Sequence, residues 1–121
     1  TTTTAAVAGG AAAARVPGVQ LYTVRSLLER DVEGTLRALA EIGYRELEFA
    51  GYYDRQPAAL RATLDGLGLR APSTHVPIEV LRASLPAALD AAAALGHAYV
   101  VCPYLAEAER TADGYRRVAA D

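Results

Sequence analysis

The sequence predicts an α/β protein in which about four strand-helix units form a parallel sheet. Short apolar segments alternate with longer amphipathic ones, and glycine recurs at Gly43, Gly68 and Gly96, directly before the apolar segments. The distance between these glycines fits one strand plus one helix. The chain is 52 % hydrophobic and 21 % charged, which is typical of a folded globular protein.

Four segments are expected to be strands because each is short, rich in strand-forming residues and preceded by a glycine or turn: 19–24, 46–50, 70–75 and 98–104. Strands joined through helices run parallel with right-handed crossovers. Two architectures satisfy this pattern, a doubly wound open sheet and a closed TIM barrel. No Gly-x-Gly-x-x-Gly follows the first strand, so a dinucleotide-binding sheet is poorly supported.

The segments between the strands carry apolar residues every three or four positions, so each predicted helix has one face to bury. Each of the first three ends at a glycine, which adopts positive φ without a Cβ clash. Two prolines suit first helical turns, and Thr111 with Asp113 begins a fourth helix. The expected buried faces are Val32, Leu36, Leu39 and Ala40, then Leu60, Leu64 and Leu67, then Leu81, Leu85, Leu89 and Ala93, and the prolines are Pro57 and Pro86.

Ligands of parallel α/β proteins bind beyond the carboxyl ends of the strands, so polar residues there are candidates for a site. In the second strand, alternation directs Glu48 inward and Leu47 and Phe49 toward the helices. A carboxylate removed from water needs a charged partner or a ligand. Glu48 is therefore either functional or bridged to Arg25 or Arg45.

His75 ends the third strand on the same inward face as Ser73. Beside Glu48, it would donate to a substrate hydroxyl or bind a metal; the alternative is a hydrogen bond to the backbone alone. Tyr22 and Tyr104 either line a sugar pocket or complete the core.

Four other residues have weaker patterns. We expect His97, at the opposite end of its strand, to be structural, and Cys102 to pack as a small hydrophobic residue. Tyr52 and Tyr53 either close over a ligand or cap the rim of the sheet.

Composition excludes several classes of partner. The net charge of −2 and the absence of a basic block argue against nucleic acid, and one cysteine cannot form an internal disulfide. Residues 1–14 are a run of four threonines followed by small apolar residues. The stretch is shorter than the ~20 apolar residues that span a bilayer, so no membrane partner is expected. This stretch resembles the end of a signal peptide. We expect residues 1–15 to be a flexible leader and residues 16–121 to be the folded domain, which is periplasmic if the leader is a signal remnant and cytoplasmic otherwise.

Four segments then bear a family resemblance: GVQLYTVR at 18–25, TLRALAEIGYRELEFAG at 35–51, APSTH at 71–75 and VVCPY at 100–104. Together they resemble the sugar phosphate isomerase/epimerase family of xylose isomerase-like TIM barrels. The resemblance runs from Val16 to the end of the chain and favours the barrel over the open sheet. It implies a partial (β/α)8 TIM barrel, the N-terminal half of a fold that needs ~250 residues.

The resemblance implies that the complete protein isomerises or epimerises a sugar or sugar phosphate by metal-assisted proton transfer through an enediolate. In such enzymes a divalent ion (Mn, Mg, Zn or Co) is held by later strands, so we expect no metal ligand in this chain, which would be inactive alone. Substrate-side roles fall to His75, Glu48, Gln20, Tyr22 and Tyr104. The alternative is a non-catalytic sugar-binding or self-assembling half-barrel module, which would form a homodimer.

Overall fold

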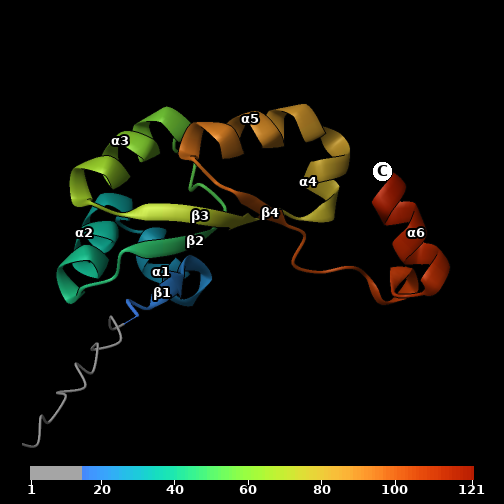
Figure 1. The fold of residues 1–121 in the computed structure, drawn as a ribbon, viewed down its shortest axis with the longest axis horizontal. Helices are drawn as coiled ribbons and strands as arrows, with labels where there is room; N and C mark the ends of the chain where they lie inside the picture. Colours follow the sequence, from blue (N-terminus) through green and yellow to red (C-terminus); the bar gives the residue numbers. More distant parts are fainter. Residues whose placement is uncertain (1–14) are drawn as a thin grey trace, which may run out of the picture.

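The computed structural model describes residues 15–121 and contains one parallel sheet with helices packed along one side (Figure 1). Residues 1–14, most of the predicted leader, lie outside the described residues. The strands follow the order β1-β2-β3-β4, and every neighbouring pair is parallel. Along the chain the elements are β1 (Gly18–Gln20), the 3-10 helix η1 (Leu21–Val24), α1 (Arg25–Leu28), α2 (Val32–Ile42), β2 (Glu46–Ala50), α3 (Pro57–Leu67), β3 (Arg70–His75), α4 (Ile78–Ala83), α5 (Leu85–Leu95), β4 (Tyr99–Val101), the 3-10 helix η2 (Glu107–Glu109) and α6 (Ala112–Ala120).

Two of the four predicted strands have the expected bounds, β2 and β3. The first prediction is wrong beyond Gln20, where the side-chain oxygen of Gln20 accepts a hydrogen bond from the backbone N–H of Tyr22 and the chain turns into η1. A side chain that bonds its own backbone two residues ahead competes with the sheet ladder. The fourth strand is shorter than predicted and ends before Pro103, which has no N–H to donate.

The first two long helices bury the faces that their periodicity predicts. Leu36 in α2 is fully buried, and Leu60 and Leu64 in α3 are 2 % and 1 % exposed. They pack against Leu47 and Phe49 of β2, each 1 % exposed, in the main hydrophobic cluster. The predicted alternation of β2 is therefore confirmed, with its apolar residues toward the helix layer.

The third helix differs from the prediction of one continuous helix. Ser84 adopts an extended conformation between α4 and α5, and its hydroxyl accepts a hydrogen bond from the N–H of Ala87. This cap starts a new helix, in which the buried residues are Ala92 and Leu95. The predicted face is thus wrong: Leu85 and Leu89 are 42 % and 48 % exposed, and Ala93 is also exposed.

The helix boundaries predicted from glycine and threonine are confirmed. The three glycines that end α2, α3 and α5 have φ of 118°, 66° and 76°. Thr111 caps α6, which lies at the far end of the molecule in Figure 1. Arg82 of α4 holds this last segment through ion pairs of 2.8 Å to Glu109 and Asp121. Within residues 15–121, none of the helices is long and apolar enough to cross a membrane.

Candidate functional site

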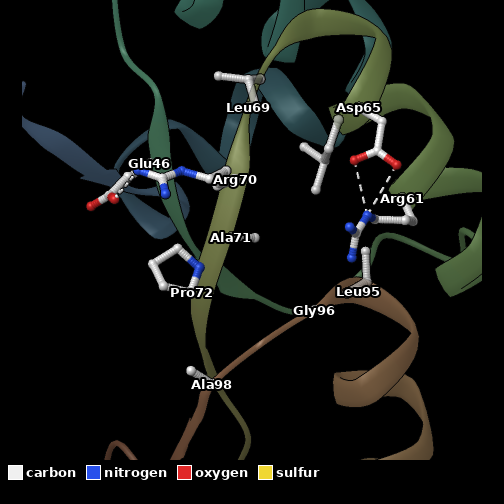
Figure 2. A pocket seen from close by; sticks show the side chains of 11 residues that line it. Glu46, Arg61, Asp65, Leu69, Arg70, Ala71, Pro72, Leu95, Gly96 and Ala98 are labelled. Carbon is white, nitrogen blue, oxygen red and sulfur yellow. Dashed lines mark hydrogen bonds and ion pairs between the residues drawn. The ribbon is translucent and has the colours of Figure 1, made fainter.

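A pocket at the amino ends of the strands is a poor candidate for the site. Its volume is about 260 Å³, and its charged residues are already paired. Figure 2 shows the two pairs on opposite sides of β3, Arg70 with Glu46 at 2.8 Å and Arg61 with Asp65 at 2.9 Å. In barrel folds this end of the strands serves stability rather than chemistry.

A larger, open hollow of about 680 Å³ lies at the carboxyl ends of all four strands. β1 contributes Gln20, β3 contributes His75, and the loop after β4 contributes Tyr104; Tyr22 completes the wall. Four of the five predicted site residues thus surround one cavity. The fifth, Glu48, lies on the same face of the sheet but outside this hollow, where it lines a smaller depression together with Gln20.

An irregularity in β3 brings the site residues level with one another. Glu46 is opposite Arg70, whereas Glu48 is opposite Ser73, so β3 contains one residue more than β2 between these two pairs. The extra residue is a β-bulge, and it places both Ser73 and His75 on the same face of the sheet as Glu48. This face, which points away from the helix layer, is called the concave face below. Ser73 consequently lies beside Glu48.

Glu48 and His75 form the centre of a hydrogen-bonded row. Glu48 Oε1 lies 2.9 Å from His75 Nε2, and the hydroxyl of Ser73 donates to the other carboxylate oxygen of Glu48. On its far side, His75 Nδ1 lies 3.1 Å from the side-chain nitrogen of Gln20. The row continues to the backbone N–H of Tyr22. The side chains of Glu48 and His75 are 28 % and 29 % exposed, so a ligand on this face of the sheet has access to them.

The alternative in which Glu48 is bridged to an arginine is wrong. Arg25 instead stacks on the ring of Tyr22 at 4.1 Å and donates to the backbone carbonyl of Tyr22 at 2.8 Å. Arg45 donates to the carbonyl oxygens of Ala40 and Tyr44. Among the described residues, the side chains that bond Glu48 are those of Ser73 and His75 in β3.

The two tyrosines of the hollow belong to its surface. Tyr22 and Tyr104 are 58 % and 66 % exposed, so the alternative that they complete the core is wrong. The guanidinium group of Arg110 lies over the ring of Tyr104 at 5.3 Å and donates to its hydroxyl at 3.3 Å. Cys102 is only partly buried, with its thiol 3.5 Å from the carbonyl oxygen of Tyr104.

His97 and Tyr52 pack on the opposite side of the sheet, away from the hollow. His97 Nδ1 donates to the carbonyl oxygen of Ala71 at 2.6 Å, and Nε2 accepts from the hydroxyl of Tyr52 at 3.2 Å. The rings of His97 and Tyr52 are stacked 6.0 Å apart. Burial lowers the pKa of His97, partly offset by the bond to Ala71, and raises the pKa of Tyr52. His97 is thus structural, as expected, and Tyr52 does not close over the hollow. Tyr53 also packs against the core cluster.

Sequence reasoning left Ser73 out of the site. Its signal was present, since Ser73 precedes His75 by two residues and therefore shares its face of the strand. The described residues do not form a metal site by themselves: within 15–121, no group of three or more His, Cys, Asp or Glu side chains is placed to hold an ion. Glu48 and His75 are a pair that bond each other directly.

Comparisons with known proteins show which fold this sheet belongs to. No protein-family model matches the chain, and no curated protein matches it. One solved structure, titled a sugar phosphate isomerase/epimerase from Parabacteroides distasonis, superposes with a TM-score of 0.68 and 23 % identity over 92 % of this chain and 48 % of its own. A second structure with the same description and organism gives 0.64 and 21 %, over 85 % and 48 %. The chain therefore has the fold of a partial (β/α)8 barrel and spans about half the length of these proteins.

Proposed function

We propose that this chain is half of a barrel that isomerises or epimerises a sugar or sugar phosphate, and that it belongs to the sugar phosphate isomerase/epimerase family. The observation that carries the proposal is the row of Gln20, His75, Glu48 and Ser73 on the concave face at the carboxyl ends of the strands. Two solved proteins with this fold are described as sugar phosphate isomerase/epimerases, which supports the same assignment.

The hollow and the depression beside it, which share Gln20, suit a polyhydroxylated ligand. Glu48 accepts hydrogen bonds from hydroxyl groups, and the amide of Gln20 donates one. Tyr22 and Tyr104 offer aromatic faces and hydroxyls, and both are exposed to the hollow. The role of each of these residues, and of His75, in binding substrate is part of the proposal.

The proposed reaction is proton transfer next to a carbonyl group, through an enediolate. In keeping with the family resemblance, we propose a divalent ion (Mn, Mg, Zn or Co) for the complete barrel, with ligands from strands other than these four. Residues 15–121 offer only the Glu48 and His75 pair, so the chain alone is expected to lack activity.

Exchange of substrate protons with solvent tests the proposal. The complete natural protein is first identified by its intact mass, which is expected to be near that of ~250 to 300 residues. This protein and the 121-residue chain are then incubated in D₂O with aldoses, ketoses and their phosphates, with Mn²⁺ or Mg²⁺ and without metal. Metal-dependent exchange by the complete barrel, reduced at least tenfold by Glu48→Gln, supports the proposal. Exchange by the 121-residue chain above its metal-free control contradicts its inactivity.

A second candidate function is a sugar-binding module that assembles from two copies. β1 pairs only with β2 and β4 only with β3 among the described residues, so both edges have free backbone groups. On the concave face, Tyr99 and Val101 are 68 % and 37 % exposed. Sedimentation of the purified chain discriminates: a stable homodimer favours the module, whereas a monomer favours a half of one longer barrel.

A further inference from the structure

The directions of the hydrogen bonds in the Glu48 row can be assigned from one fixed donor. A backbone N–H only donates, and the N–H of Tyr22 bonds one atom of the Gln20 amide. That atom must therefore be the carbonyl oxygen of the side chain. The other atom, which faces His75, is the amide nitrogen, and it only donates. The usual ambiguity of an amide side chain is thus removed here.

The orientation of Gln20 fixes the proton on His75. The amide nitrogen lies 3.1 Å from His75 Nδ1, so Nδ1 must accept and has no proton. A neutral imidazole then has its proton on Nε2. Nε2 lies 2.9 Å from a carboxylate oxygen of Glu48, to which it donates. Ser73 donates to the other oxygen, so Glu48 receives two donors and acts as a carboxylate.

We infer that Glu48 is the hydrogen-bond acceptor that this site presents to a ligand, and that His75 and Ser73 are positioning residues whose donor protons hold it in place. Both nitrogens of His75 are engaged within the row. The groups that remain available are lone pairs of Glu48 and the second N–H of Gln20. On this inference His75 takes part in ligand binding through Glu48, which it holds in place, and does not itself donate to a substrate hydroxyl.

The alternative tautomer of His75 is disfavoured at both ring nitrogens. A proton on Nδ1 would point at the donor N–H of Gln20, and the bare Nε2 would face a carboxylate oxygen. Rotating the amide of Gln20 to rescue the first contact would place its NH₂ group against the N–H of Tyr22. Each rearrangement sets like polarities together at hydrogen-bond distance, where an unmade bond costs about 1–3 kcal/mol.

The available groups define the chemistry of the ligand, a step that rests on the proposed function. An acceptor and a donor on neighbouring strands match a hydroxyl group beside a second oxygen, as in the hydroxy-carbonyl unit of an open-chain sugar. Glu48 accepts a hydrogen bond from the hydroxyl group, and the amide nitrogen of Gln20 donates one to the neighbouring oxygen.

The proton positions can be measured directly on the intact 121-residue chain labelled with ¹⁵N at histidine. Long-range ¹H–¹⁵N spectra distinguish a protonated ring nitrogen from a bare one. We expect His75 to be protonated at Nε2 at pH 7.5. His97 is an internal control of opposite tautomer, because its Nδ1 donates to Ala71 and its Nε2 accepts from Tyr52. Gln20→Leu should give a mixture of tautomers at His75, whereas Gln56→Leu, whose side chain caps nothing, should leave the spectrum unchanged.

The ligand-free spectrum decides the inference. Protonation of His75 at Nδ1, or a mixture of tautomers in the unsubstituted chain, overturns it. Addition of D-fructose, to a sample that is also labelled with ¹³C at glutamate, is a separate step, in which the carboxylate carbon of Glu48 should shift while His75 keeps its tautomer. A change of tautomer on binding would also overturn the inference. If D-fructose and its phosphates shift no resonance, the assignment of the ligand to Glu48 and Gln20 fails, and the assignment of the donor protons stands on the first spectrum.

Discussion

Replacement of Gly96 by alanine should destabilise the fold, mainly because Gly96 has a backbone conformation that residues with a Cβ rarely adopt. Gly96 ends α5 with φ of 76°, in the left-handed region. An L-residue with a Cβ loses about 1–2 kcal/mol there. The added Cβ would also lie 2.5 Å from Nη1 of Arg61, the mobile end of a long side chain. Arg61 can move, at the cost of its exposed pair with Asp65, worth about 0.3–0.5 kcal/mol.

The expected loss for Gly96→Ala is therefore about 1–2.5 kcal/mol in the free energy of unfolding. Gly66 provides the matched control, because it lies inside α3 with negative φ and with nothing within 4 Å of an added Cβ. Gly66→Ala should stabilise the chain by about 0.5–1 kcal/mol through helix propensity.

Urea unfolding followed by circular dichroism measures both variants against the parent chain. The midpoints should move in opposite directions at an unchanged slope. The reasoning is refuted if Gly96→Ala unfolds at the same urea concentration as the parent or a higher one. A double variant with Arg61→Ala separates the cost of the backbone conformation from the cost of displacing Arg61. The loss of stability that persists without Arg61 belongs to the backbone conformation alone.

Two further predictions test the core and the half-buried His97. Leu36→Ala removes a fully buried side chain and should cost about 2–5 kcal/mol, whereas Leu89→Ala, 48 % exposed, should cost less than about 1 kcal/mol; equal losses in urea unfolding would contradict the assigned helix faces. Because burial lowers the pKa of His97 below its ordinary 6.5, the unfolded chain binds that proton more readily, and stability should fall as pH drops below 6.5. His97→Gln should lose less stability between pH 7.5 and 5.5 than the parent. An equal loss would contradict the assignment of this pH dependence to His97.

Local signals of sequence predicted the parts of the fold that depend on single residues. Glycines at positive φ end the helices, and Thr111 begins the last one, because these choices involve only a few neighbouring atoms. The same holds for β2, where alternation alone separates Glu48 from Leu47 and Phe49.

The errors arose where two local signals competed. In the third helix, a regular spacing of leucines suggested one continuous face, but Ser84 followed by Pro86 is a start signal, and it prevailed. In β1, the side chain of Gln20 bonds its own backbone and ends the strand. The bulge in β3 was also concealed by alternation, although Pro72 inside a strand is itself a sign of irregular pairing.

The distribution of polar residues between the two faces of the sheet supports a ligand at the concave one. On the helix side, the only buried polar residue described is Thr74, and leucine and phenylalanine fill the remaining space. On the concave side, Gln20, Glu48, Ser73 and His75 satisfy one another, and no buried polar side-chain atom in the described residues lacks a partner.

Such a row adds little net stability, because each bond replaces one to water. Apolar residues at these four positions would build a more stable barrel interior, as they do on the helix side. Packing alone therefore gives no reason for this row. Its oriented donors leave lone pairs of one carboxylate and one amide N–H unengaged on the face of the sheet that carries the hollow, which is the arrangement that recognition of an oxygen-rich ligand requires.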